Sequence, residues 1–252
     1  MKRILILIVS ALALSSSLAL AQGLSDLELL TALDEVRFFD DTVTQISIRI
    51  ISETPDETRE AELRLSFFDS DDGSFARIEF ATPEELAGQI FLSTPDATYF
   101  YGPDLDFPIK TSATTQVFGD SAVAQTSGIR FADSYTIGER RTIDSEDGAE
   151  TLQIDLVAVD FNVAFQAITV NIEPVSIRPI SAILYAVSGL PFYEVFYEAY
   201  ETREDDVYVT TQRIVNQLLL GRVTTSEILE VGTDVLSAEF FNPDLLGTSD
   251  TP

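Results

Sequence analysis

The sequence predicts a mainly β protein with few helices, in which many short strands form one large, strongly curved antiparallel sheet. Three observations lead to this class. Apolar and polar residues alternate over many short runs, turn residues separate most of these runs, and only one run has a clear helical period. Consecutive strands joined by short turns favour an antiparallel sheet, and a sheet of this size is expected to twist and curve.

One helix is clearly predicted, over residues 24–39. Ser25 and Glu28 have the spacing of a capping box, in which each residue's side chain bonds the other's backbone amide. Apolar residues then recur at helical spacing, so that one broad face of the helix is expected to be buried. These residues are Leu27, Leu30, Leu33 and Val36, joined by Leu29, Ala32 and Phe39.

Strands are predicted wherever a period of two is seen, as in residues 61–67, where apolar side chains alternate with Glu, Arg and Ser. A second capping box at residues 82–85 predicts one helical turn, and a short helix is expected near residues 121–125 inside a long loop, 102–131. The predicted strands are 46–50, 61–67, 75–81, 90–93, 97–101, 134–144, 150–158, 165–173, 180–187, 192–200, 207–216 and 223–231.

The apolar side of such a sheet needs cover, and the helix at 24–39 and the loop at 102–131 are the segments expected to provide it. Both are small for this task. Either a cavity remains over the sheet, or the sheet folds on itself as a closed sandwich. Strand periodicity fits both arrangements equally well.

The N-terminus predicts export. Lys2 and Arg3 precede an apolar run, and residues 19–21 match the Ala-x-Ala pattern of a signal-peptide cleavage site. We therefore expect a signal peptide at residues 1–21, a single β domain at 22–252 whose last few residues are a disordered tail, and a periplasmic or other extracytoplasmic location. No later run is long and apolar enough to span a membrane, so none is expected in the mature chain.

Composition narrows the chemistry. The chain has no His and no Cys, which removes the usual general base, the thiolate nucleophile and the commonest zinc ligands. Residues 69–73 are rich in Asp but fail the spacing of a calcium-binding EF-hand loop. We therefore expect no catalytic residues, no metal and no cofactor. The net charge of −27, which becomes −29 without Lys2 and Arg3, argues against a nucleic-acid partner.

Four segments together resemble the LolA-like lipoprotein-carrier family, and especially its branch of outer-membrane lipoprotein-sorting proteins. The first is Arg77-Ile78-Glu79-Phe80 followed by Pro83, Gly88 and Phe91-Leu92, and the second is the aromatic strand end Tyr99 to Pro103. The third is a hairpin that contains Gly189-Leu190-Pro191. The fourth is the Thr-rich run from Thr224 followed by the ending Phe241 to Leu246.

The resemblance implies a half-open β-barrel lidded by short helices, whose hydrophobic cavity holds the acyl chains of lipoproteins or lipids. Such a carrier or chaperone catalyses nothing and takes its cargo from a membrane-bound donor to an acceptor protein during outer-membrane biogenesis. The alternative is a closed β domain that binds a protein partner in a structural or envelope-stress regulatory role. The candidate cavity residues are Ile46, Ile48, Ile50, Leu63, Leu65, Phe67, Ile78, Phe80, Phe91, Tyr99, Tyr101, Ile183, Tyr185 and Phe196.

Overall fold

A computed structural model describes residues 21, 23–39, 42–71, 73–144, 148–203 and 206–247. Apart from Ala21, the predicted signal peptide lies outside these residues, as do the end of the predicted tail (248–252) and parts of the predicted turns at 144–148 and 201–206. Among the described residues, no helix is long and apolar enough to cross a membrane.

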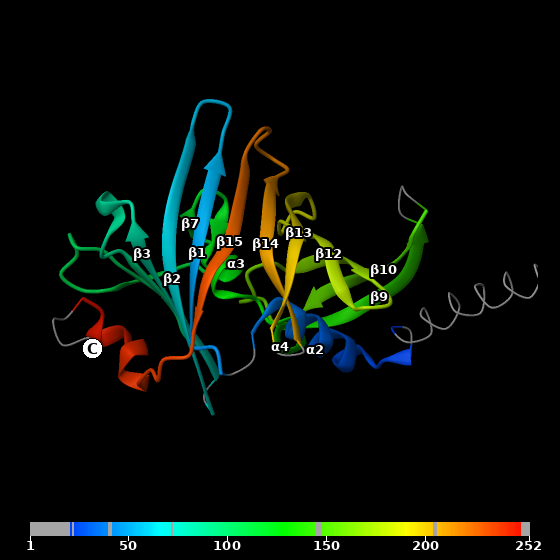
Figure 1. The fold of residues 1–252 in the computed structure, drawn as a ribbon, viewed down its shortest axis with the longest axis horizontal. Helices are drawn as coiled ribbons and strands as arrows, with labels where there is room; N and C mark the ends of the chain where they lie inside the picture. Colours follow the sequence, from blue (N-terminus) through cyan, green and yellow to red (C-terminus); the bar gives the residue numbers. More distant parts are fainter. Residues whose placement is uncertain are drawn as a thin grey trace, which may run out of the picture. The chain divides into compact units, whose positions relative to one another are not determined.

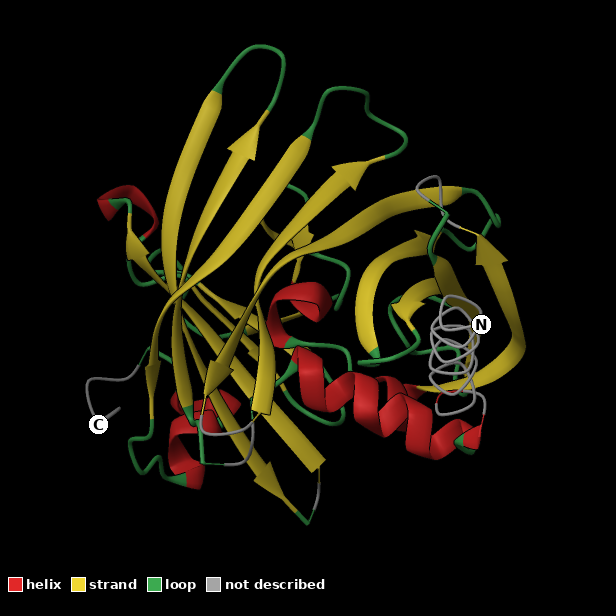
Figure 2. Ribbon diagram, turned by 45° about the vertical axis from the view of Figure 1, so that its right-hand side comes forward, coloured by secondary structure: helices red, strands yellow, loops and turns green. Residues whose placement is uncertain are grey.

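Strands make up most of the fold, and the helices are few and short (Figures 1 and 2). The strands of the main sheet are β1 (Gln45–Glu53), β2 (Thr58–Ser70), β3 (Gly73–Thr82), β4 (Ile90–Ser93), β5 (Thr98–Tyr101), β6 (Ile109–Thr111), β9 (Tyr135–Asp144), β10 (Glu150–Ala158), β11 (Ala167–Glu173), β12 (Arg178–Tyr185), β13 (Pro191–Arg203), β14 (Asp206–Asn216) and β15 (Val223–Gly232).

The predicted class is confirmed. The thirteen strands form one antiparallel sheet in the order β6-β5-β4-β3-β2-β1-β15-β14-β13-β12-β11-β10-β9, so the sheet has two free edges and does not close into a barrel. By their contacts the residues divide into two compact units, which we describe separately. Unit 1 comprises residues 1–37 and 130–192, and unit 2 comprises residues 38–129 and 193–252.

In unit 1, helix α2 (Asp26–Arg37) packs on the sheet through β12 and β9. The predicted capping box is present: the Ser25 amide donates to Glu28 Oε2 at 2.8 Å, and the Glu28 amide donates to Ser25 Oγ at 3.3 Å. The Ser25 hydroxyl also donates to Glu28 Oε2 at 2.7 Å, and this bond, followed by the bond from the Ser25 amide, lowers the pKa of the Glu28 carboxyl. Leu29, Leu30 and Leu33 are buried as predicted, but Leu27 is 63% exposed and lies outside the buried stripe.

A short helix that the sequence pattern did not predict, α4 (Phe131–Ser134), packs beside α2. The carboxylate of Asp34 on α2 accepts hydrogen bonds from the Phe131 and Ala132 amides, both at 2.9 Å, and it pairs with Arg37. Burial nevertheless raises the pKa of Asp34 above its usual value. The buried carboxylate therefore fixes the start of α4 against α2.

In unit 2, the long strands β1, β2 and β3 pair in register with one another, and β15 pairs with the other side of β1. Because side chains alternate along a strand, each face of this part of the sheet carries its own apolar cluster. Two segments outside the main sheet cover these faces. One is the segment 112–128, and the other is the C-terminal segment 233–247.

The second predicted capping box is wrong. Residues 84–86 form only a 3₁₀ turn, η1 (Glu84–Leu86), and no side chain caps it. The Thr82 hydroxyl, which was expected to cap, instead accepts a hydrogen bond from the Glu62 amide at 3.1 Å on the neighbouring strand. The competing strand partner explains the difference, because a hydroxyl already bonded across the sheet does not serve a helix start.

Candidate functional site

The first apolar cluster of unit 2 contains most of the candidate cavity residues. Nine of the fourteen lie in it, on one face of β1, β2, β3 and β4, and we call this surface the Leu63 face. They are Ile46, Ile48, Ile50, Leu63, Leu65, Phe67, Ile78, Phe80 and Phe91. The shared face follows from the alternation seen in the sequence and from in-register pairing, such as Ile48 with Leu63 and Leu65 with Ile78.

Residues 112–128, the covering segment, lie on the Leu63 face. This segment contains the two-stranded ribbon β7 (Gln116–Phe118) and β8 (Ser121–Ala122), followed by helix α3 (Val123–Ser127), which packs on β3 and β4. The helix is close to the one predicted near 121–125, whereas the sequence pattern did not indicate the ribbon. The position of α3 and β7 relative to β1 and β15 can be followed in Figure 1.

Only a few apolar side chains of the covering segment enter the cluster. Phe118 packs edge-on against Phe80, with ring centroids 6.4 Å apart, and Val123 is fully buried. Val117 is partly buried beside them. Ser, Thr, Ala and Gly make up most of the remaining segment, so its grip on the face depends on few large contacts.

In this conformation the Leu63 face is packed. Ile50, Leu63 and Ile78 are at most 1% exposed, so no water-sized space adjoins them. An acyl chain on this face would therefore take the place of Phe118 and Val123. The covering segment would have to move away before any ligand could reach these side chains.

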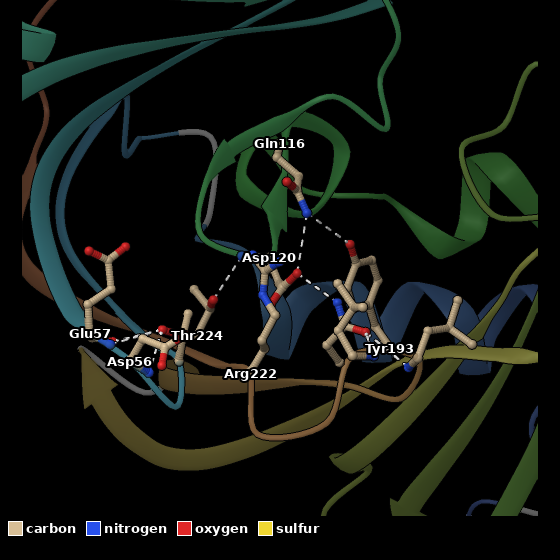
Figure 3. A network of polar contacts seen from close by, with 11 residues as sticks. Asp56, Glu57, Gln116, Asp120, Tyr193, Arg222 and Thr224 are labelled. Atoms are coloured by element: carbon tan, nitrogen blue, oxygen red, sulfur yellow. Dashed lines mark hydrogen bonds and ion pairs between the residues drawn. The ribbon is translucent and has the colours of Figure 1, made fainter.

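A buried polar latch holds the covering segment to the strands at one end (Figure 3). Asp120 is 1% exposed and accepts hydrogen bonds on Oδ1 from Asn216 Nδ2 at 2.8 Å and from Gln116 Nε2 at 3.2 Å. Its other oxygen lies 3.3 Å from Arg222 Nε, an ion pair without hydrogen-bond geometry. The Asp120 amide donates to Thr224 Oγ1 at 2.9 Å. We call Asp120 and these four partners the Asp120 latch.

The turn that presents Asp120 requires glycine. Gly119 has φ +58°, a conformation that favours residues without a Cβ. A Cβ added at this position would lie 2.5 Å from Thr224 Oγ1 and 2.6 Å from Ser52 Oγ, which is too close for either hydroxyl to remain in place. The turn therefore approaches β1 and β15 closely enough for the Asp120 amide to reach Thr224.

Tyr193 on β13 lies at the rim of the latch. Its hydroxyl accepts a hydrogen bond from Gln116 Nε2 at 3.5 Å (Figure 3). Burial, and secondarily the negative charge of Asp120, raises the pKa of this phenol. Tyr193 therefore remains neutral at physiological pH and adds polar contact without adding charge.

Tyr99 and Tyr101 lie on the opposite face of unit 2, which we call the Leu92 face. The structure therefore does not bring them together with the nine residues of the Leu63 face. They pack with Leu92 of β4 and with Phe241 and other apolar residues of the C-terminal segment. This segment includes the 3₁₀ turns η2 (Ala238–Phe241) and η3 (Pro243–Leu245). The expectation that only residues 24–39 and 102–131 provide cover is wrong for this reason.

The C-terminal segment is anchored through Arg77 and Phe241. Arg77 is buried on the Leu92 face; its Nη1 donates to the Phe240 carbonyl at 2.9 Å, and its guanidinium lies 4.0 Å from the Phe240 ring centroid. Phe241 is 1% exposed and stacks on Phe68, with centroids 5.5 Å apart. Leu246 is buried with it, so the two ends of the Phe-x-x-x-x-Leu ending are its anchors.

The last three candidates, Ile183, Tyr185 and Phe196, belong to neither apolar cluster of unit 2. In unit 1, Ile183 pairs with Thr169, and the Tyr185 hydroxyl is 3.3 Å from the Thr169 hydroxyl. This row is polar: Thr169 also donates to Asp155, which binds Arg141. In unit 2, the Arg213 guanidinium lies 4.4 Å from the ring centroid of Phe196.

The sequence pattern did not indicate the Asp120 latch, since Asn216 and Thr224 are 96 and 104 positions away along the chain and only Gln116 is near. A local signal existed only for the turn, where Gly119 precedes Asp120. No group of three or more Asp or Glu residues that could hold a metal ion occurs within the described part of the chain. What the geometry provides is an apolar face, a light cover and a polar latch.

Several solved structures share the fold of this chain. A LolA superfamily protein from Nitrosomonas europaea, NE2245, is 20% identical and aligns with 88% of this chain and 100% of its own, with a TM-score of 0.80. An outer membrane lipoprotein-sorting protein domain from Vibrio parahaemolyticus is 17% identical, with coverages of 90% and 99% and a TM-score of 0.73. The predicted resemblance to LolA-like proteins is thus confirmed at the level of the fold.

A third structure, a DUF1329 family protein from Desulfovibrio piger, is 15% identical, with coverages of 88% and 97% and a TM-score of 0.70. No curated protein matches the sequence significantly. A family model described as an uncharacterized protein matches residues 74–248, which is more than half of the chain. The chain belongs to this family, and its fold is that of the LolA superfamily.

Proposed function

We propose that this protein is a periplasmic carrier that binds the acyl chains of lipoproteins or lipids on the Leu63 face and delivers them toward the outer membrane. The observation that carries the proposal is one continuous apolar face under a cover that contributes few large side chains. The fold shared with the LolA superfamily protein and the lipoprotein-sorting domain supports the same class of activity. The proposal includes no catalysis and no cofactor.

The energetics favour exchange of the cover for an acyl chain. Moving Phe118 and Val123 off the face loses roughly 1.5–3 kcal/mol for each side chain, and opening the Asp120 latch adds to this cost. An acyl chain of about 16 carbons gains about 0.8 kcal/mol for each buried methylene. A chain that covers most of the face therefore outweighs the loss, while the cover protects the empty face from water.

The alternative remains a closed β domain that binds a protein partner. The observation in its favour is that Ile50, Leu63 and Ile78 are packed in the conformation described. The two functions make opposite predictions for removal of the cover. A carrier without part of its cover binds acyl chains more tightly, whereas a closed domain only becomes less stable.

The decisive comparison is Phe118→Ala with Phe241→Ala. Both side chains are buried, and both belong to segments outside the main sheet, but they cover opposite faces of it. Each substitution should lower the free energy of unfolding by about 3–5 kcal/mol, measured in urea. Only Phe118→Ala should increase affinity for a fluorescent fatty acid, because only it uncovers the Leu63 face.

Failure of the wild-type protein to bind the fatty acid, together with no gain in Phe118→Ala, would reject the carrier and leave the closed domain. An equal gain in both variants would show that the probe senses instability and not the Leu63 face. If the alanine variant does not fold, Phe118→Leu replaces it in the comparison, since leucine reduces the contact with Phe80 without emptying the site.

A further inference from the structure

The turn between β14 and β15 exposes three consecutive leucines. Leu218, Leu219 and Leu220 are 52%, 50% and 87% exposed. Single exposed apolar side chains are common on protein surfaces, but a run of three in a polar turn is unfavourable unless it has a function. We call residues 218–220 the leucine turn, and it plays no part in either apolar cluster of unit 2.

The backbone of the leucine turn is hydrogen-bonded internally. Asn216 Oδ1 accepts from the Leu218 amide at 3.0 Å and from the Leu219 amide at 2.8 Å. The Arg222 amide donates to the Leu219 carbonyl at 3.3 Å, and the Asn216 amide donates to the Arg222 carbonyl at 3.1 Å. Asn216 is itself held by Asp120, so the turn is presented in a defined shape.

Satisfied backbone groups matter because of what they permit. An unpaired amide or carbonyl is costly in a hydrocarbon environment, where no water can replace the missing partner. Here the amides of Leu218 and Leu219 and the carbonyl of Leu219 already have partners within the protein. These bonds lower the desolvation cost of moving the leucine turn, with its exposed apolar side chains, into hydrocarbon.

The surroundings indicate which apolar medium fits. The leucine turn lies beside the β1–β2 turn (Figure 1), where a Cβ on Gly221 would be 3.1 Å from Pro55. Asp56 and Glu57 are exposed in that neighbouring turn, and the whole chain carries a charge of −27. Carboxylates so close to the leucines disfavour an anionic surface and are compatible with a zwitterionic one.

We propose that the leucine turn is a reversible membrane-contact element that inserts into zwitterionic phospholipid. Consecutive side chains in a tight turn project in different directions, and a fluid lipid surface accommodates all of them, whereas a rigid protein groove does not. Three leucines give weak attachment, comparable at most to a single myristoyl chain with a partition constant of about 10⁴ M⁻¹. A weak anchor suits a protein that must leave the membrane again. The proposal is independent of acyl binding on the Leu63 face.

The absence of Trp from the chain makes a direct test possible. Leu220→Trp places a single indole in the leucine turn, and Val187→Trp places one in the β12–β13 turn, where Val187 is 92% exposed. With vesicles of pure phosphatidylcholine, the emission of Leu220→Trp should shift to the blue, and lipids brominated along their chains should quench it. The emission of Val187→Trp should not change.

A second pair of variants tests the native side chains. Replacing all three leucines with Ser should reduce sedimentation with phosphatidylcholine vesicles about tenfold or more. The matched control, Val187→Ser with Leu190→Ser, removes exposed apolar side chains from another turn and should bind like the wild type. Adding phosphatidylglycerol to the vesicles should weaken binding, because the protein is strongly acidic. Urea unfolding curves confirm that each variant is folded.

Several results would overturn the proposal. These are an unshifted Leu220→Trp spectrum at millimolar phosphatidylcholine, an equal shift in Val187→Trp, or stronger binding to anionic vesicles. A Leu220→Trp spectrum that changes only when a membrane protein is added to the vesicles would also overturn it, and would assign the leucine turn to a protein groove. Phosphatidylcholine itself has acyl chains, but their binding on the Leu63 face would not shift the emission of an indole in the leucine turn. The Leu220→Trp spectrum therefore distinguishes failure of this proposal from failure of the proposed function.

Discussion

Removal of the Asp120 carboxylate should release the covering segment while the sheet beneath it stays folded. Asp120→Ala deletes two hydrogen bonds to a buried charged group, each worth about 1.5–3 kcal/mol, and leaves Arg222 without its ion-pair partner. Breaking a buried pair by removing one member typically costs about 3–5 kcal/mol. We expect a loss of this size, concentrated in the covering segment because its other large contacts are Phe118 and Val123.

Amide hydrogen exchange measures this local loss directly. The Val123 amide donates to the Thr115 carbonyl at 2.9 Å, and the Ala124 amide donates to the Ala113 carbonyl at 2.8 Å, both within the covering segment. A short two-stranded ribbon is only marginally stable by itself, so both amides should lose protection when the segment leaves the sheet. Their exchange should become roughly 100-fold faster or more in Asp120→Ala, since each 1.4 kcal/mol is a factor of ten. Amides of the central strand β2 should change much less.

Asp120→Asn and Asp104→Ala are the matched controls. Asp120→Asn keeps an oxygen for Asn216 and Gln116 but loses the charge that faces Arg222, so its effect should lie between wild type and Asp120→Ala. Asp104 is exposed, and its removal changes the net charge equally without touching the latch. If the carrier proposal is correct, acyl affinity should rise in Asp120→Ala by no more than the factor by which opening increases.

Two outcomes would refute this reasoning. Uniformly faster exchange in β2 and in the covering segment would show that Asp120 stabilises the whole fold and does not latch one part of it. Unchanged exchange at Val123 and Ala124 would show that the apolar contacts alone hold the segment in place.

Two further predictions concern an alkaline transition and the N-terminus. Burial raises the pKa of the Tyr135 phenol, whose hydroxyl donates to the Phe165 carbonyl at 2.9 Å. The resulting stability is complete below the ordinary tyrosine pKa of about 10 and is lost as pH rises above it. Tyr135→Phe should therefore be about 1 kcal/mol less stable than the wild type at pH 7, and it should lose less stability as the pH is raised to 11. Equal slopes of unfolding free energy against alkaline pH in the two proteins, measured in urea, would contradict this. The mature protein should begin at Gln22, and N-terminal sequencing that finds Met1 would contradict a cleaved signal peptide.

The period of two in the sequence was enough to predict the Leu63 face. Leu63, Leu65 and Phe67 alternate with polar residues within one strand, so their common direction is a local property. Pairing with β1 and β3 then depends only on keeping one apolar face dry. The capping box at Ser25 is local in the same way, which explains why the predicted helix, 24–39, differs from α2 (Asp26–Arg37) by only two residues at each end.

Tyr99 and Tyr101 were misplaced because their face depends on register between strands. Tyr99 pairs with Leu92 and Tyr101 with Ile90, whereas Phe91 pairs with Phe100. The register is set by the turn in which the Thr94 amide donates to the Ala97 carbonyl at 2.9 Å. Counting residues across that turn would have placed both tyrosines on the face of the sheet that does not contain Phe91. No comparable count exists for Asp120, whose partners come from strands far along the chain.

Among the described residues, the open sheet ends in two edge strands, β6 and β9, whereas a closed barrel has none. Each is a template on which a second molecule can add a strand. β6 has only three residues and carries Lys110, and β9 contains Glu139, Arg140 and Arg141 next to a register shift at its own Gly138. Short length, charge and irregular pairing all discourage strand addition. An open sheet thus requires protection against polymerisation, and the two edge strands provide it.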